Sequence, residues 1–330
     1  MRMDILTIGE AMAELSANVQ SPFPQTNTKQ APENFSGKMF SFGFAGDAYN
    51  TAVAAARLGS QVGFISAVGQ DPFANALLQT LRQEKIHTDW IKTLASGFTG
   101  VYFCFDSHPE QPDPRFYYYR KGSAASLLNE SHIPIKAVQQ SKILFSTGVS
   151  LSLSGETRKA ILKAFKIAKE NNVMTAFDPN YRAKLWRNEA EAYDAMNALL
   201  PYVDIILTST PGDTQPLIGF SKPSQIIEFF SFKNIKLVVV KAGSDGCYLG
   251  YKKQIEHVPA LPVDNTELIH PVGAGDAFNG GFLHGLAEQR SLIDCARLAS
   301  VVSGLKVQAE GTVAALPYRN AAYERAFLSE

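Results

Sequence analysis

Short apolar strands alternate with helices along most of this chain, and this alternation limits the folds that it can adopt. A parallel strand needs a crossover of a dozen or more residues before the next strand, and a helix is the usual crossover. Strands that are buried on both faces read as nearly continuous apolar runs, as they do here. We therefore predict one doubly wound α/β domain over residues 1–330, with helices flanking a mostly parallel sheet. The predicted strands are 4–9, 62–68, 143–147, 173–178, 203–207 and 237–241, the predicted helices are 50–58, 72–84, 155–171, 189–199, 224–230, 274–289 and 292–308, and an antiparallel edge hairpin is predicted at 247–250 and 255–258.

Two segments interrupt the alternation of strand and helix. Residues 11–44 contain several prolines and end in an aromatic run, a mixture that favours a loop followed by exposed strand. Residues 100–106 and 115–120 read as two aromatic strands joined by a proline-rich loop. We predict that two separated insertions, at about 11–45 and 97–125, together form a small accessory β-sheet.

The charge balance argues against strongly charged partners. Thirty-one basic residues offset thirty-one acidic ones, so no net field would attract nucleic acid or an anionic membrane surface, and a small-molecule ligand is favoured. Cys104, Cys247 and Cys295 are far apart and lack metal-ligand spacing, which predicts reduced thiols. The sequence shows no signal peptide and no apolar span of about 18 residues, so we expect a cytoplasmic protein.

The stretch HPVGAGDAFNGGFL, residues 270–283, combines a glycine-rich turn with a carboxylate. Gly273 and Gly275 allow a ligand to approach the backbone closely, and the free N–H groups of the helix that begins there favour an anion. A phosphate already bound there would be repelled by Asp276, so the carboxylate is better explained as a base beside a hole for charge that develops during the reaction. Transfer of a phosphoryl group to a hydroxyl needs this combination.

The glycine-rich stretch at 270–283, taken alone, also has other interpretations. Acidic residues are favoured in the first turn of a helix without any catalytic role, and that interpretation of Asp276 stays open. A dinucleotide-binding fingerprint fits poorly, because Phe278 takes the third glycine position and the motif lies late in the chain. A Walker loop is excluded, because no Lys followed by Ser or Thr comes after the glycines.

Three motifs occur in order along the chain: AGDAYNTAV at 45–53, VKAGSDGCY at 240–248 and GAGDAF at 273–278. Together they resemble the motifs of ribokinase or PfkB-type carbohydrate kinases, and the similarity covers essentially the whole chain. Two further stretches, YYRKGSAAS at 118–126 and FDPNYRAKLW at 177–186, are similar to those of 2-keto-3-deoxygluconate kinases. The resemblance implies a ribokinase-like fold in which the small β-sheet is a lid over the sugar. It also implies a homo-oligomer formed through that lid.

By position, the resemblance implies roles for individual residues. Asp276 would remove the proton from the sugar hydroxyl, and the backbone N–H groups of Gly273, Ala274 and Gly275 would stabilise the transferring γ-phosphoryl group of ATP. Arginines suit a sugar acid, since a guanidinium can hold a carboxylate through two hydrogen bonds. The implied sugar-binding residues are Gly46, where a side chain would collide with the ligand, Asp47, Tyr102, Tyr118, Arg120 and Arg182. The implied ATP-binding residues are Lys241, Gly243, Ser244, Gly246 and Ser300.

Alternation along the second aromatic strand sorts its side chains by face. Tyr118 and Arg120 would share one face, and Tyr117 and Tyr119 would share the other. Only one of these pairs is expected to contact a ligand, and we assign the ligand to Tyr118 and Arg120. A structural role for Arg120 and for Arg182 at strand ends is the alternative.

Three positions depart from the family's pattern. His270 stands where an acid or amide usually helps to bind a monovalent cation, which puts that cation in doubt. The acidic motif associated with Mg²⁺ is altered, and Asp213 is the weak candidate that replaces it; Mg²⁺ needs few protein ligands, so activity is still expected. Ser300 replaces an asparagine on the adenine side.

The leading interpretation is an ATP-dependent kinase that phosphorylates the terminal hydroxyl of 2-keto-3-deoxygluconate. A fructokinase, or a kinase of another keto sugar with the same fold, is the first alternative. A sugar- or nucleotide-binding regulator with impaired turnover is the alternative from another class. A nicotinamide-dependent enzyme is disfavoured, because the N-terminal glycine fingerprint is missing.

Overall fold

The fold of the chain is a doubly wound α/β domain, as the sequence predicts. The computed structural model describes residues 2–17, 39–105, 115–263 and 269–327. Its main sheet has nine strands in the order β13-β12-β11-β10-β9-β8-β1-β4-β5. All neighbours from β11 to β5 pair in parallel, and β12 and β13 form the predicted antiparallel hairpin at one edge. The strands are β1 (Ile5–Ile8), β4 (Val62–Val68), β5 (Ile91–Thr93), β8 (Ile143–Thr147), β9 (Met174–Asp178), β10 (Ile205–Ser209), β11 (Leu237–Lys241), β12 (Cys247–Tyr251) and β13 (Gln254–Val258).

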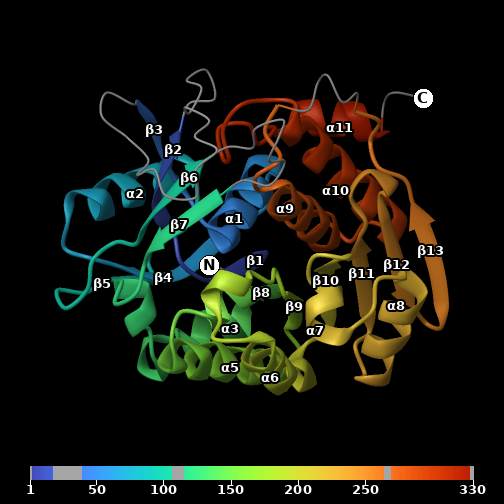
Figure 1. The fold of residues 1–330 in the computed structure, drawn as a ribbon, viewed down its shortest axis with the longest axis horizontal. Helices are drawn as coiled ribbons and strands as arrows, with labels where there is room; N and C mark the ends of the chain where they lie inside the picture. The colour runs from blue at the N-terminus through green and yellow to red at the C-terminus, as the bar shows by residue number, and fades with distance from the viewer. Residues whose placement is uncertain (1, 18–38, 106–114, 264–268, 328–330) are drawn as a thin grey trace, which may run out of the picture.

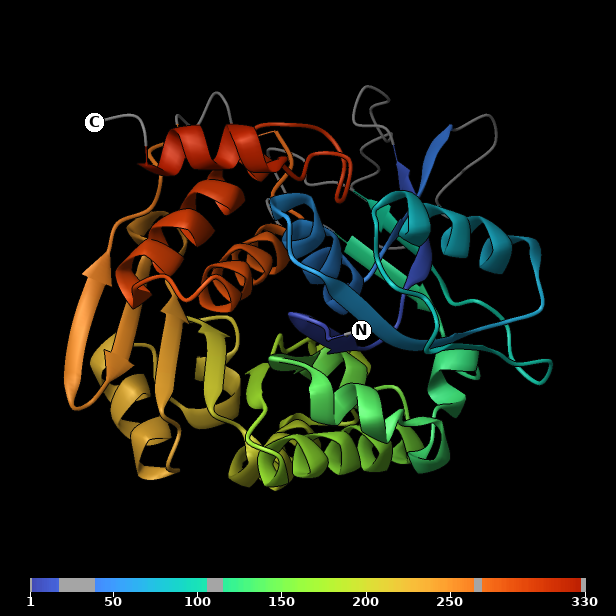
Figure 2. The ribbon, with the colours of Figure 1, turned by 180° about the vertical axis from the view of Figure 1, so that it is seen from behind.

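Helices cover both faces of the main sheet, as Figure 1 and Figure 2 show from opposite sides. One apolar core joins the sheet to α1, α2, α9, α10 and α11, and a second joins its other face to α3, α5, α6 and α8. The helices are α1 (Asp47–Leu58), α2 (Pro72–Gln83), α3 (Ile135–Gln140), α4 (Gly148–Leu151), α5 (Gly155–Glu170), α6 (Glu189–Leu199), α7 (Thr214–Ile218), α8 (Pro223–Phe232), α9 (Ala274–Ala287), α10 (Leu292–Val307) and α11 (Arg319–Phe327), with 3₁₀ turns at Ala124–Leu127, Glu130–His132, Ala183–Leu185, Leu200–Tyr202 and Gly243–Asp245. Within the described ranges, no helix is both long and apolar enough to cross a membrane.

A separate four-stranded sheet contains the two predicted aromatic strands. Its order is β3 (Phe40–Ala45), β2 (Met12–Ala17), β6 (Val101–Phe105) and β7 (Arg115–Tyr119). The sequence predicts a loop where β2 lies, and that prediction is wrong. β2 forms because it has ladder partners on both sides, antiparallel with β3 and parallel with β6. Those partners lie far along the chain, so the local sequence of β2 does not reveal them. The parts of the two insertions at 18–38 and 106–114 lie outside the described residues.

The carboxyl ends of the parallel strands meet at one edge of the main sheet. β9 ends there at Asp178, β10 at Ser209 and β11 at Lys241. In open α/β sheets, ligands bind beyond this edge. α1 and α9 also begin at this edge and pack closely together. Glycine at position 280 permits this approach, since a Cβ there would lie only 2.4 Å from the Cβ of Ala54. This close packing brings the N-terminal and C-terminal motifs into one site.

Candidate active site

A cavity of about 590 Å³ lies at the carboxyl edge of the main sheet. It opens between the small sheet, the ends of three parallel strands and the start of α9. The glycine-rich loop and Asp276 form one wall, as the sequence predicts. Its lining residues are Phe116, Tyr118, Asp178, Asn180, Arg182, Ala183, Lys184, Ser209, Gly212, Asp213, Lys241, Pro271, Val272, Gly273, Ala274, Gly275 and Asp276.

The glycine-rich loop turns sharply into α9. Gly273 is the N-cap residue, with φ of 81° in the left-handed region that glycine adopts most easily. Ala274 is the first helical residue, and its N–H donates to the carbonyl oxygen of Pro271 at 3.2 Å. The N–H groups of Gly275 and Asp276 lack intrahelical partners and point toward the cavity end of the helix. A Cβ on Gly275 would come 3.7 Å from the Nζ of Lys241. The helix dipole and this ammonium therefore favour an anion at the same place.

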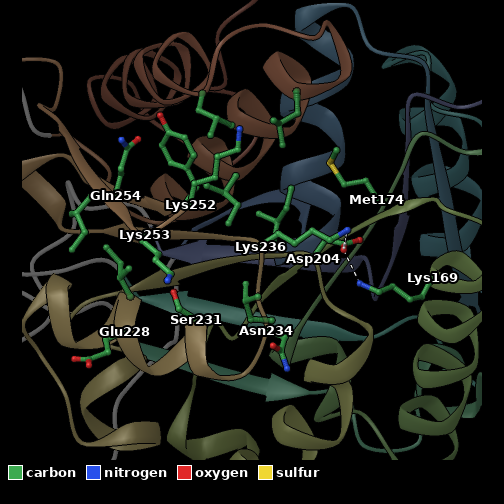
Figure 3. A pocket seen from close by; sticks show the side chains of 18 of the residues that line it. Lys169, Met174, Asp204, Glu228, Ser231, Asn234, Lys236, Lys252, Lys253 and Gln254 are labelled. Carbon is green, nitrogen blue, oxygen red and sulfur yellow. Dashed lines mark hydrogen bonds and ion pairs between the residues drawn. The ribbon is translucent and has the colours of Figure 1, made fainter.

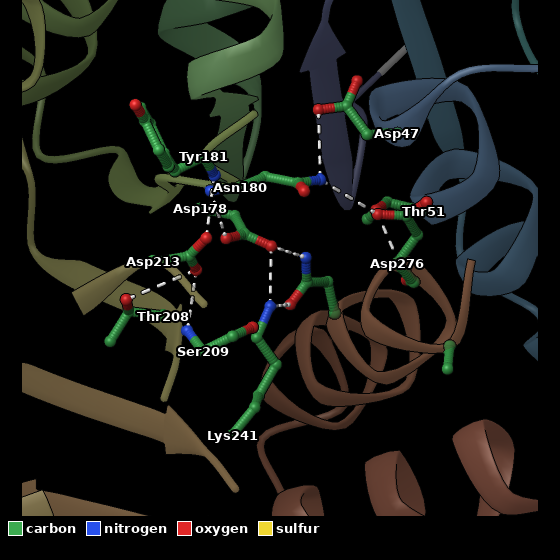
Figure 4. A network of polar contacts seen from close by, with 12 residues as sticks. Asp47, Thr51, Asp178, Asn180, Tyr181, Thr208, Ser209, Asp213, Lys241 and Asp276 are labelled. Atoms are coloured by element: carbon green, nitrogen blue, oxygen red, sulfur yellow. Dashed lines mark hydrogen bonds and ion pairs between the residues drawn. The ribbon is translucent and has the colours of Figure 1, made fainter. Parts of the chain in front are cut away.

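Asp276 is buried at the start of α9, and two amides approach its carboxylate; Figure 4 shows the approach of Asn180. The Nδ2 of Asn50 donates to Oδ2 at 2.8 Å, and the Nδ2 of Asn180 lies 3.4 Å from Oδ1. Burial raises the pKa of Asp276 to about 7, with further contributions from the charges of Asp47 and Asp178, while the hydrogen bond from Asn50 opposes the rise. A carboxylate whose pKa lies near neutral pH is suited to accept a proton during a reaction.

Lys241 is held at the floor of the cavity and is almost fully buried. Its Nζ lies 2.7 Å from Oδ2 of Asp178 and 3.1 Å from Oδ1 of Asn279, while Asn279 donates to the same Asp178 oxygen at 2.6 Å. These contacts fix the ammonium below Gly275. Lys241 was predicted in the ATP pocket; it lines this cavity beside the glycine-rich loop, and its contact with ATP stays a prediction.

The other predicted ATP-binding residues do not line this cavity. Gly243 and Ser244 lie in a 3₁₀ turn directly after β11. A Cβ on Gly246 would lie 2.2 Å from the carbonyl oxygen of Val258, so packing against β13 already requires glycine there. Ser300 is buried on α10, and its Oγ has no hydrogen-bond partner among the described residues. Their role in binding ATP stays a prediction.

The two predicted arginines lie in different environments. Arg182 lines the cavity, is exposed, and its Nη1 donates to the carbonyl oxygen of Tyr181 at 2.9 Å. Arg120 does not line the cavity and is buried, with its Nε 2.7 Å from Oε2 of Glu10 and its Nη2 3.2 Å from the carbonyl oxygen of Val149. Glu10 therefore already neutralises Arg120, although Nη1 of Arg120 is buried without a partner in the described part of the chain.

The tyrosines of the small sheet follow the predicted alternation. Tyr118 faces the cavity, whereas Tyr117 and Tyr119 are 42% and 63% exposed on the outer face. Tyr102 is buried behind Tyr118, with ring centroids 5.9 Å apart. Tyr102 does not itself line the cavity, so the structure places it as a support for Tyr118.

Two residues at the start of α1 are buried beside Asp276. Asp47 accepts a hydrogen bond from the N–H of Ala48 at 2.8 Å, and burial raises its pKa. Gly46 has φ of 148°, and a Cβ there would lie 2.4 Å from the carbonyl oxygen of Glu10. The backbone after β1 therefore already requires glycine at this position, and the predicted collision of a side chain with the ligand stays a prediction.

Asp213, the candidate metal ligand, is committed to the backbone. Its Oδ1 accepts from the N–H of Tyr181 at 2.7 Å, and its Oδ2 accepts from the N–H of Ser209 at 2.8 Å (Figure 4). Burial and the nearby charge of Asp178 raise the pKa of Asp213. Among the described residues, no group of three or more His, Cys, Asp or Glu side chains is placed to hold a metal ion. These observations favour a structural role for Asp213.

Sequence reasoning assigned no role to several residues that complete the site. They are Glu10, Asn50, Asp178, Asn180 and Asn279. Asn50, Asp178 and Asn180 lie within the motifs at 45–53 and 177–186, so the motifs were a usable signal. Asn279 likewise lies in the stretch 270–283, directly after GAGDAF, whereas Glu10 carries no comparable signal, since its contacts depend on the fold.

A second, larger cavity of about 1220 Å³ lies at the opposite edge of the main sheet, near the starts of β9, β10 and β11 (Figure 3). Among the lysines that line it, Lys169 and Lys236 both pair with Asp204, at 2.7 Å and 2.8 Å. Its lining includes none of the glycine-rich loop and none of the raised-pKa carboxylates. The first cavity is therefore the candidate active site.

The carboxyl edge of this doubly wound sheet brings a helix N-terminus and a buried carboxylate together, the arrangement that transfer of a phosphoryl group to an alcohol needs. The family model for pfkB family carbohydrate kinases matches residues 2–319. This chain belongs to the pfkB family and is an ATP-dependent sugar kinase. Two curated relatives named 2-dehydro-3-deoxygluconokinase are each 30% identical: the Bacillus subtilis protein, with 97% of this chain and 94% of the relative covered, and the Thermoproteus tenax protein, with 96% and 91% covered. The solved structure assigned as ribokinase II from E. coli, in complex with ATP and Mg²⁺, superimposes with a TM-score of 0.83 at 25% identity and covers 98% of both chains.

Proposed function

We propose that this protein phosphorylates the terminal hydroxyl of 2-keto-3-deoxygluconate, also called 2-dehydro-3-deoxygluconate, with ATP as the donor. The observation that carries the proposal is the position of Asp276: a buried carboxylate with a pKa of about 7 stands at the first turn of the helix that supplies the anion hole. Base and anion hole thus lie side by side, as transfer of a phosphoryl group to an alcohol requires.

In the proposed reaction, the terminal hydroxyl oxygen of the sugar attacks the γ-phosphorus of ATP. The hydroxyl proton moves to the carboxylate of Asp276, the new O–P bond forms, and the bond to the bridging oxygen breaks to release ADP. The N–H groups of Gly273, Ala274 and Gly275 offset the charge on the transferring group, and Lys241 adds a fixed positive charge below Gly275.

The carboxylate of the sugar acid is assigned to Arg182, with Tyr118 against the sugar. Arg182 is exposed at the cavity and has no acidic partner among the described residues, so its charge is available to a ligand. The unpartnered Nη1 of Arg120 can add a single donor, but its bond to Glu10 leaves it a secondary contact. The names of the two relatives support a keto sugar acid as substrate.

ATP and Mg²⁺ are proposed as donor and metal. Asp178 and Asp213 are carboxylates that line the cavity, and both already accept hydrogen bonds from protein groups. Mg²⁺ keeps several waters and often binds mainly through substrate phosphates, so a metal that arrives with ATP needs few ligands from the protein. When bound, Mg²⁺ would neutralise phosphate charge.

The outer face of the small sheet supports a homo-oligomer formed through it. Phe42 on β3 and Tyr117 and Tyr119 on β7, the two edge strands of this sheet, are 52%, 42% and 63% exposed. Large exposed aromatic side chains gathered on one face are typical of a protein interface.

The first test is ADP release from ATP and Mg²⁺ with a panel of 2-keto-3-deoxygluconate, gluconate, fructose, ribose and adenosine. We expect kcat/KM for the keto acid to exceed that for every other sugar at least tenfold. In Asp276→Asn, kcat should fall at least about 100-fold while ATP affinity measured by calorimetry stays within threefold. Unchanged turnover in this variant would remove Asp276 as the base.

A keto-sugar kinase without acid selectivity is the second candidate, and the pairing of Arg120 with Glu10 favours it, since this pairing leaves one free guanidinium at the cavity. Preferential turnover of fructose in the same panel would establish it. Binding of sugar and ATP with no ADP production from any sugar would instead identify a binding regulator.

A further inference from the structure

Lys306, in the last turn of α10, is a fully buried lysine outside the cavity. Its Nζ lies 2.6 Å from the carbonyl oxygen of His270 and 3.0 Å from Nδ1 of the same residue. An ammonium group has donors only, so Nδ1 must act as the acceptor and the ring proton of a neutral His270 lies on Nε2. His270 is itself buried, so both contacts are made away from solvent.

The burial of this side chain requires an explanation. Taking an ammonium group out of water is costly unless it is well paired, and the cost grows as water is excluded. A lysine near a helix C-terminus interacts favourably with the helix dipole from the surface as well, so the dipole does not explain why Lys306 turns inward. The inward direction brings its charge to the loop that precedes the anion hole.

The last turns of α10 hold this loop at both ends. The N–H groups of Ile269 and His270 donate to the carbonyl oxygen of Val307 at 2.9 and 3.1 Å. One turn earlier, Oγ of Ser303 donates to the carbonyl oxygen of Ala274 at 2.9 Å. Residues 303 and 306 are three apart and therefore lie on one face of the helix. The ammonium of Lys306 thus lies on the face of α10 that carries the start of α9.

We propose that Lys306 is a positioning residue for phosphoryl transfer, and that its ammonium serves as a built-in cation beneath the anion-binding loop. It fixes the carbonyl group of His270, and with it the direction in which the loop enters Gly273. Its charge also offsets the negative charge that gathers on the transferring phosphoryl group, in a site where charges are weakly screened. Turnover then needs no dissolved monovalent cation. This inference rests on the proposed kinase function.

The experiment compares wild type, Lys306→Ala and Lys306→Met in buffers whose only monovalent cation is tetramethylammonium, Na⁺, K⁺, NH₄⁺ or n-propylammonium. Propylammonium matches the part of the side chain that the alanine variant lacks, whereas methionine fills the same space without a charge. Lys166→Ala, at an exposed position on α5, is the matched control. Each variant is assayed for kcat, for KM of the keto acid, for ATP·Mg²⁺ affinity by calorimetry and for Tm.

Wild type and Lys166→Ala should turn over equally, within twofold, in all five salts. Lys306→Ala should lose about 100-fold in kcat in tetramethylammonium, with KM for the sugar within threefold, and regain at least tenfold in K⁺, NH₄⁺ or propylammonium. Lys306→Met should lose as much and regain nothing. If Lys306→Ala does not fold, Lys306→Met alone tests the proposal. A wild-type kcat in Lys306→Met would then overturn it.

Three other outcomes would overturn it: a wild type that K⁺ activates tenfold or more, an alanine variant with wild-type kcat in every salt, or a loss that no cation restores. Failure of the kinase function gives a different result, because wild type then releases no ADP from any sugar in any salt. In that case the ATP·Mg²⁺ affinity still decides whether Lys306 supports the loop. It should fall at least tenfold in Lys306→Ala and recover with K⁺ or propylammonium, and an unchanged affinity would reject the role of Lys306.

Discussion

The pH dependence of turnover tests the most specific electrostatic feature of the site, the crowding of carboxylates around Asp276. Because Asp276 must be ionised to accept a proton, kcat/KM should rise with pH through an ionisation of about 7 and level off above it. The rate falls toward low pH because, below the raised pKa of Asp276, the carboxylate is protonated and cannot accept the proton of the hydroxyl. A profile that is flat between pH 5.5 and 8 would refute this assignment of the base.

The decisive variant is Asp47→Asn, which removes one negative charge and keeps the shape of the side chain. Asp47 and Asp276 both lie 3.4 Å from Nδ2 of Asn180, so their nearest oxygens are separated by no more than about 7 Å. At an effective dielectric constant of about 20, two charges at this distance repel by about 2.4 kcal/mol, or about 1.7 pKa units. Burial also raises the pKa of Asp47, and two interacting carboxylates share their macroscopic ionisations, so we expect the acid limb to move down by about one pH unit.

The assay is kcat/KM for the sugar from pH 5 to 9 at saturating ATP and Mg²⁺. Asp194→Asn, at an exposed position on α6, is the control with the same chemical change and should keep the wild-type profile. An ionisation of ATP or of the sugar would appear unchanged in all three enzymes. An acid limb that stays in place or moves up in Asp47→Asn would refute the reasoning, whatever the absolute rate.

Arg182→Ala should raise KM for 2-keto-3-deoxygluconate at least tenfold and leave KM for fructose within twofold in steady-state assays, because the available guanidinium selects the carboxylate; equal effects on both sugars would contradict this. Asp276→Asn should raise Tm in calorimetry by more at pH 8 than at pH 5: the raised folded-state pKa means that the carboxylate begins to destabilise the fold above its ordinary value of 3.8 and does so fully above about 7. A gain independent of pH would show that ionisation is not its cause. Gly46→Ala should lower the free energy of unfolding in urea by more than about 2 kcal/mol, because its Cβ would meet the carbonyl group of Glu10 at 2.4 Å; wild-type stability would show that the backbone yields there. Tyr119→Lys should shift the mass measured by light scattering toward the monomer, and an unchanged mass would place any interface elsewhere.

The sequence by itself determined the longer strands of the main sheet and the longer helices that cover it. The strands at 62–68 and 237–241 and the helix at 189–199 lie where they were predicted, because apolar periodicity and flanking turn residues fix such elements locally. The anion-binding character of the glycine-rich loop and the position of Asp276 beside it could likewise be predicted from the sequence. The N–H groups that favour an anion belong to the backbone of the helix itself, so no distant residue is needed. The shorter elements α3, α4, α7, α11 and β5 were not predicted. They span too few residues to show a period, or, in the case of α11, form where the chain packs against α1 and α10.

Tertiary structure alone decided how the charges in the site are shared. Arg120 and Arg182 look alike in sequence, yet Glu10 neutralises one while the other faces the cavity. Asp213 reads in sequence as a carboxylate available to a metal, yet each of its oxygens accepts a backbone N–H group. Lys306 gave no signal in sequence, where it reads as an ordinary lysine near the end of a helix. The pairing, burial and pKa of these side chains depend on neighbours from distant parts of the chain. The distances between such residues in the fold cannot be predicted from a local sequence pattern.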